Sequence, residues 1–158
     1  LSDTPLDDFF ASYPDFSYNP RASATDEFYR MCDEFGWDSK RNTQKRRKAH
    51  QLFKDALVHQ FNQTYGTEVN SLRSWQALCE ALGLDEIPDT LKDCQEVVEG
   101  VYVNIVDFVD AREGGAHAQV KIFDTEVRLS EYTIKTGKYF PKENAYAGGL
   151  LRHLLRQI

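Results

Sequence analysis

Six basic side chains gather within nine positions, where a long helix is predicted to begin. Cations at the start of a helix oppose its dipole, so helix stability does not account for them. Such a patch can neutralise phosphates, with an affinity that falls as salt rises. Its Lys-Arg-Arg-Lys core also matches a nuclear import signal, and a solvated surface gives the same pattern. The residues predicted to bind a nucleic acid or another partner are Lys40, Arg41, Lys45, Arg46, Arg47 and Lys48.

The rest of the chain is acidic, which isolates this patch. Residues 35–54 hold one acid and seven bases, a local charge of +6, within a chain of net charge −6. Residues 80–113 hold ten acids and two bases, a local charge of −8. These acids would repel a long duplex, or they could be the counter-charge of the patch within the molecule.

A second candidate contact combines rings and charges near the C-terminus. Aromatic side chains set between charges are typical of anchors at protein interfaces. The alternative is that Phe140 and Tyr146 pack in the core. The residues predicted to bind a protein partner are Lys138, Tyr139, Phe140 and Tyr146.

Three acids recur at helical spacing in a third stretch. On a helix Asp107, Asp110 and Glu113 would share a face, which suits Mg²⁺ binding or acid–base chemistry. A solvated acidic face explains the same spacing more simply. An enzyme whose site is assembled in space around Asp107, Asp110 and a histidine therefore stays an alternative.

Motifs that would indicate catalysis or metal binding are absent from the sequence. There is no G-x-G-x-x-G, Walker loop, H-E-x-x-H or G-x-S-x-G, and the four histidines are scattered. The sequence therefore predicts no catalytic residue, no cofactor and no metal site. Cys32, Cys79 and Cys94 lie in apolar helical patterns without C-x-x-C, which indicates buried, reduced thiols and favours a reducing compartment.

The hydrophobic periodicity predicts a mainly α fold, an irregular bundle of about six helices with a minor short β element near Gln119–Phe123. Residues 1–24, with three prolines, are expected to form an extended N-terminal arm, and residues 25–158 a single helical domain. No apolar run approaches the ~20 residues needed to cross a bilayer. Helix starts are predicted near Thr25, Thr43, Ser71, Thr90, Thr125 and Pro141. Residues 101–109 suit either a strand or a short helix, and the spacing of their acids favours the helix.

Four segments together carry a resemblance. They are FYRMCDEFGW (28–37), QFNQTYGT (60–67), VNIVDFVD (103–110) and TGKYFPKENAYAGG (136–149). With them the chain resembles, from about Phe9 to its end, a group of small uncharacterised helical proteins common in filamentous fungi. The resemblance implies a fungal, intracellular origin and a self-contained domain. It implies no activity, cofactor or site residue.

These patterns favour a non-enzymatic interaction module of the cytoplasm or nucleus. We expect it to bind another protein or a second copy of itself, because two oppositely charged surfaces suit the steering of a partner. The alternative is a nuclear protein that binds nucleic acid through residues 40–48. The sequence indicates no membrane contact and no particular oligomeric state.

Overall fold

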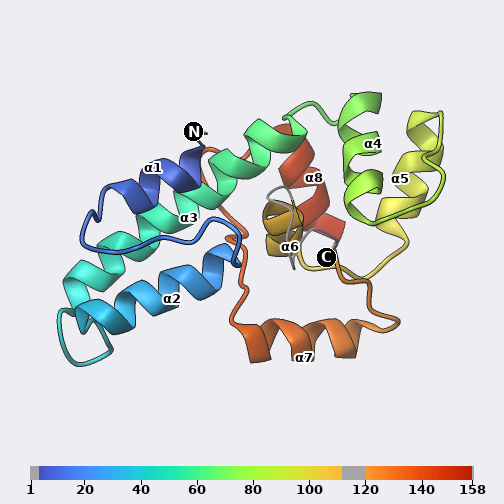
Figure 1. The fold of residues 1–158 in the computed structure, drawn as a ribbon. Helices are drawn as coiled ribbons and strands as arrows, with labels where there is room; N and C mark the ends of the chain where they lie inside the picture. The colour runs from blue at the N-terminus through green and yellow to red at the C-terminus, as the bar shows by residue number, and fades with distance from the viewer. Residues whose placement is uncertain (1–3, 112–119, 158) are drawn as a thin grey trace.

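The computed structural model describes residues 4–111 and 120–157, and this part of the chain is mainly helical (Figure 1). It holds no strand, and its one isolated β-bridge joins Tyr102 and Phe123 in antiparallel fashion. The predicted β element is thus not seen as a strand. The helices are α1 (Pro5–Ala11), α2 (Ala24–Phe35), α3 (Thr43–Tyr65), α4 (Leu72–Ala81), α5 (Leu91–Glu99), α6 (Ile105–Ala111), α7 (Glu126–Thr136) and α8 (Gly149–Gln157).

The N-terminal segment departs from the extended arm predicted over residues 1–24, because it contains α1. Thr4 caps this helix by accepting a hydrogen bond from the backbone N–H of Asp7, whose carboxylate accepts from Thr4 N–H in return. Pro5 occupies the first turn, where its missing N–H costs nothing. The buried side chains Phe9 and Phe10 then hold α1 against α3.

The long helix α3 organises the fold. It contacts α1, α4 and α6, and α2 meets it through the stacked rings of Phe28 and Phe53. Gln60 is buried on α3 and accepts a hydrogen bond from Leu6 N–H, which fixes the position of α1. One apolar cluster runs from Leu6 to Leu154 and draws on helices throughout the described chain.

The C-terminal half contacts α3 through α4 and α6. Helices α4 and α5 pack as a pair, α6 and α8 lie in the middle of the molecule, and α7 lies along one side (Figure 1). Cys79 and Cys94 are buried where α4 meets α5, and Cys32 is buried in α2, so the predicted burial of the thiols is confirmed. Burial raises the pKa of Cys79 to about 12.

The last helix begins at Gly149 rather than at Pro141, which corrects the predicted start. Two contacts with residues distant in sequence determine where this helix begins. The Asn144 side chain accepts from Tyr146 N–H and donates to Asp55 on α3, holding residues 144–146 in a turn. Leu150 N–H donates to the carbonyl of Thr67, so the first turn of α8 is tied to the end of α3.

Candidate functional site

The predicted basic run lies at the surface between the end of α2 and the first turns of α3. We call the side chains of Lys40, Arg41, Lys45, Arg46, Arg47 and Lys48 the basic surface. All are exposed except Arg46, which is half-buried. Within the described residues only Arg41 among them forms an ion pair, with Asp38 at 3.0 Å. No described acid of residues 80–113 pairs with the basic surface; the paired ones bond Lys138 or His153. Five cations are therefore left without an anion in the part of the chain that the structure describes.

The turn before α3 is shaped by Asp38. Its carboxylate accepts hydrogen bonds from the backbone N–H groups of Lys40 (2.8 Å) and Arg41 (2.7 Å), and these bonds lower the pKa of Asp38. Asn42 follows with a φ of 54°, and its side chain makes no capping bond to α3. The first turn of α3 also lacks an acid. Local interactions thus favour this helix start poorly, and core packing further along α3 must stabilise it.

Two cations, with a histidine between them, form a ridge along α3. Arg46, His50 and Lys54 are spaced by four residues, so they line one face of the helix. Burial lowers the pKa of His50, and the charges of Lys54 and Arg46 lower it further. The imidazole is therefore neutral at pH 7, between two cations. This ridge extends the basic surface toward the middle of the molecule.

A pocket of about 320 Å³ opens beside the ridge, and we call it the aromatic pocket. Its walls come from α2, from α3 and from Gly137 to Pro141, which follow α7. Phe28 stacks on Phe53 with ring centroids 4.7 Å apart, and on His50 at 5.3 Å. Lys54 lines the pocket and forms no ion pair with any described residue, and Tyr139 lines it with 59% of its surface exposed. The pocket therefore combines aromatic walls with an unpaired cation.

Gly137 fixes one wall of this pocket. It closes α7 with a φ of +69°, a conformation that glycine adopts without strain. The Tyr29 hydroxyl donates to the Gly137 carbonyl at 3.2 Å, and a Cβ at this position would lie 2.9 Å from the Tyr29 ring. This close contact joins α2 to the segment after α7.

The second predicted contact does not form one surface. Tyr139 and Tyr146 are exposed but lie at different places: Tyr139 lines the aromatic pocket, and Tyr146 packs on His59 of α3. Phe140 is half-buried against Phe61. Lys138 is 4% exposed, so its predicted role as a surface contact is wrong.

Lys138 instead lies at the centre of a buried polar network. Its ammonium is 2.9 Å from Asp107 Oδ1, 2.9 Å from the Tyr132 hydroxyl and 3.8 Å from Asp110 Oδ2. The Tyr132 hydroxyl also contacts both oxygens of Asp107. Burial alone would lower the pKa of Lys138, but hydrogen bonds to Tyr132 and Asp107 and the charges of Asp107 and Asp110 raise it. The amine therefore stays protonated and is no nucleophile.

Asp110 belongs to the same network and also completes a helix. Its Oδ1 accepts a hydrogen bond from Ala24 N–H at the start of α2, where the Ser23 side chain makes no capping bond. Burial raises the pKa of Asp110, against the effects of the Ala24 N–H and of Lys138. Asp107 and Asp110 are each 5% exposed, so the expectation of a solvated acidic face is wrong.

The sequence indicated that Asp107 and Asp110 are buried, but it did not indicate their partner. Asp107 and Asp110 sit among apolar residues on every side of α6, which is typical of a helix buried all round. The partner, Lys138, lies 31 positions away from Asp107 and follows no motif. Glu113, the third acid of the spacing, lies outside the described residues. The members of the aromatic pocket were likewise missed, although the four-residue spacing of Arg46, His50 and Lys54 was visible.

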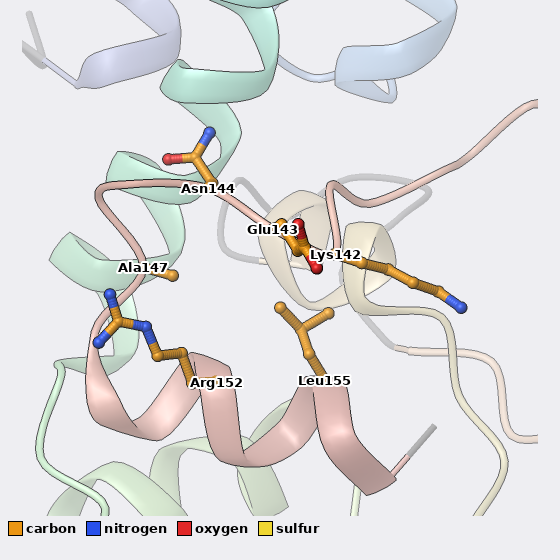
Figure 2. Close-up of a pocket in the computed structure, with 6 residues that line it drawn as sticks. All are labelled: Lys142, Glu143, Asn144, Ala147, Arg152 and Leu155. Atoms are coloured by element: carbon orange, nitrogen blue, oxygen red, sulfur yellow. The ribbon is translucent and has the colours of Figure 1, made fainter.

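Two other hollows are lined differently from the aromatic pocket. Figure 2 shows one of about 500 Å³ beside α8, where the charged ends of Lys142 and Arg152 lie on opposite sides. The other, of about 670 Å³, is an open groove between α1 and α3 with Leu52 and Tyr146 among its lining residues. Neither brings a cation and an aromatic floor together as the aromatic pocket does.

No group of three or more His, Cys, Asp or Glu side chains in residues 4–111 and 120–157 is placed to hold a metal ion. Over the same residues no helix has the length and apolar character that a bilayer crossing requires.

Comparisons with known proteins return nothing that would assign the site. The fungal origin implied by the resemblance therefore stays a prediction, and function rests on the geometry of the basic surface and its pocket. No protein-family model, no curated protein and no solved structure matches this chain.

Proposed function

We propose that the protein is a non-enzymatic interaction module that binds an acidic segment of another protein on the basic surface. One observation carries the proposal: five of the six cations there have no anionic partner in the described part of a chain whose net charge is −6. Unpaired cations on an otherwise acidic body attract a negatively charged partner at long range and orient its approach.

The surroundings of the basic surface favour a protein partner over a nucleic acid. Trp37 lies beside the basic turn, half-buried, with its ring against Tyr13 and Phe35. Half-buried aromatic side chains next to cations are common at protein interfaces. A long duplex would also meet the repulsion of the acidic remainder.

Nucleic-acid binding is the second candidate, because the same exposed cations would serve phosphates equally well. A nuclear location, with Lys45 to Lys48 as the import signal, belongs to that candidate. An enzyme finds the least support. Its candidate acids, Asp107 and Asp110, lie in a buried network, and no described histidine is bonded to either carboxylate.

Direct binding measurements separate the two leading candidates. We would follow the fluorescence anisotropy of a labelled peptide of alternating Asp and Glu, a DNA duplex and a single-stranded oligonucleotide, from ~50 to ~200 mM salt. The test variant is Lys45→Glu/Arg47→Glu/Lys48→Glu. The matched control, Arg73→Glu/Lys92→Glu/Lys135→Glu, makes the same change in net charge at exposed positions of α4, α5 and α7.

The proposal predicts that the acidic peptide binds, that its affinity falls with salt, and that only the test variant loses it. Oligonucleotide binding without peptide binding would replace the proposal by the nucleic-acid candidate. Equal losses in both variants would mean that net charge alone governs the affinity, and the basic surface would then have no special role.

A further inference from the structure

We propose that the aromatic pocket receives an aromatic side chain of the acidic partner segment, so that the preferred ligand is an aromatic residue flanked by carboxylates. This inference rests on the proposed function and names the partner's chemistry. It is carried by the placement of the pocket, by its lining and by the charges beside it.

The pocket adjoins the basic surface at Arg46, which lies one helical turn before His50 of the pocket lining. Arg46 belongs to the basic surface, and its charge acts on both Tyr29 and His50, which line the pocket. Lys54 continues the same line of α3 into the pocket itself. A peptide lying across the basic surface therefore passes the mouth of the pocket, within reach of one side chain.

The lining suits a planar apolar group. Phe28 and Phe53 form an apolar floor of buried rings stacked on each other, and the half-buried His50, which stacks on Phe28, is neutral and adds no charge to the pocket. Aromatic rings pair favourably beyond the area that they bury. A volume of about 320 Å³ is near the lower end of ligand pockets, which span roughly 300–1,000 Å³. It matches a single side chain better than a large cofactor.

The cations beside the pocket favour acidic residues on either side of the partner's inserted aromatic ring. Lys54 is half-buried without an ion pair among the described residues, and Arg46 likewise has no described anionic partner. Carboxylates on either side of an inserted ring would meet these two cations. A ring flanked by lysines would instead add like charges, so the pocket discriminates against basic segments.

The test compares two acidic peptides that differ at one position. One carries a central Trp and the other a central Ala, each within the same run of Asp and Glu and each labelled for anisotropy. The protein variants are Tyr139→Ala, which alters the pocket, and Tyr146→Ala as its control. The two tyrosines are 59% and 54% exposed, and Tyr146 lies outside the pocket. A third variant, Lys54→Gln, removes the cation but keeps most of the apolar stem.

We expect the Trp peptide to bind roughly tenfold more tightly than the Ala peptide, as for an anchor residue in a pocket. Tyr139→Ala should reduce that ratio while leaving affinity for the Ala peptide unchanged, and Tyr146→Ala should change neither. Lys54→Gln should weaken binding of the Trp peptide more than Lys92→Gln, a charge loss on α5.

Each contrary result has its own meaning. Equal affinity for the two peptides, or an unchanged ratio in Tyr139→Ala, would overturn the pocket inference and leave the proposed function standing. Failure of both peptides to bind at low salt would overturn both. Circular dichroism of every variant separates a binding defect from a folding defect.

Discussion

The protein holds charge in two opposite ways, at the basic surface and in the network around Lys138. In the network a lysine and two aspartates are buried, hydrogen-bonded and joined to Tyr132. On the basic surface the cations are exposed apart from the half-buried Arg46, only Arg41 has an anionic partner among the described residues, and the dipole of α3 opposes them. In the first arrangement Lys138 compensates the buried aspartates, so losing Lys138 would leave uncompensated charge in the interior and destabilise the fold. The basic surface has no comparable partner among the described residues, and under the proposed function another molecule supplies it.

Removing the buried cation should produce the largest effect. Lys138→Met leaves Asp107 and Asp110 buried without their counter-charge, so we expect a loss of about 3–5 kcal/mol in the free energy of unfolding. Denaturant titration measures it. Lys135→Met, which removes an exposed lysine from the last turn of α7, should cost only a few tenths of a kcal/mol. A loss below about 1 kcal/mol in Lys138→Met would place the network in the class of surface pairs.

Two glycines allow a further comparison of the two regions. Gly36 precedes the basic surface and Gly137 precedes Lys138, and both have a φ of +69°. Gly36→Ala meets no atom within 4 Å and should cost only the left-handed backbone strain, about 1–2 kcal/mol. Gly137→Ala adds a clash with the Tyr29 ring, so it should lower the free energy of unfolding more. The difference between the two variants measures the Tyr29 contact. Equal losses would mean that this ring moves aside without cost.

Reversing one charge on the basic surface should raise the free energy of unfolding, whereas Lys138→Met should lower it. Lys45→Glu places an acid in the first turn of α3 and should raise the free energy of unfolding by about 0.3–1 kcal/mol, while weakening the binding of an acidic peptide. Thermal unfolding and anisotropy check the two halves. A variant that loses both stability and binding would show that Lys45 has a structural role in the fold.

The smallest effect concerns pH and His50. Its folded pKa lies below the ordinary value of about 6.5, so between these values the unfolded chain binds more protons. The free energy of unfolding should therefore fall as pH falls through about 6.5. His50→Gln should flatten that part of the profile, measured by denaturant titration at about pH 5.5 and about pH 7.5. An unchanged slope would assign the dependence to other groups.

The sequence predicted the helices well where their ends are set locally. Ser71, Thr90 and Thr125 accept hydrogen bonds from backbone N–H groups in their helices, as their types suggest. Helix α1 was missed because the prolines that follow it outweighed the Thr4–Asp7 capping box. The start of α8 was misplaced because Asn144 and Thr67 hold the preceding residues through contacts distant in sequence.

The candidate site likewise contains some residues that could be predicted from the sequence and others that could not. The basic surface could be predicted because its residues are consecutive and their exposure follows from their charge. The aromatic pocket could not, since α2, α3 and the segment at Tyr139 meet only in three dimensions. Lys138 was misread because the burial of a lysine depends on its partner, and Asp107 is remote in sequence.

The bond from Ala24 N–H to Asp110 has a consequence for the order of folding. It spans 86 positions and caps α2 with a residue of α6. During synthesis the start of α2 therefore lacks this cap until α6 has emerged and docked. Closing a loop of this length is entropically costly, so α2 should fray in any fragment that ends before α6. The start of α2, a helix that lines the aromatic pocket, should therefore become fully ordered only once α6 is in place.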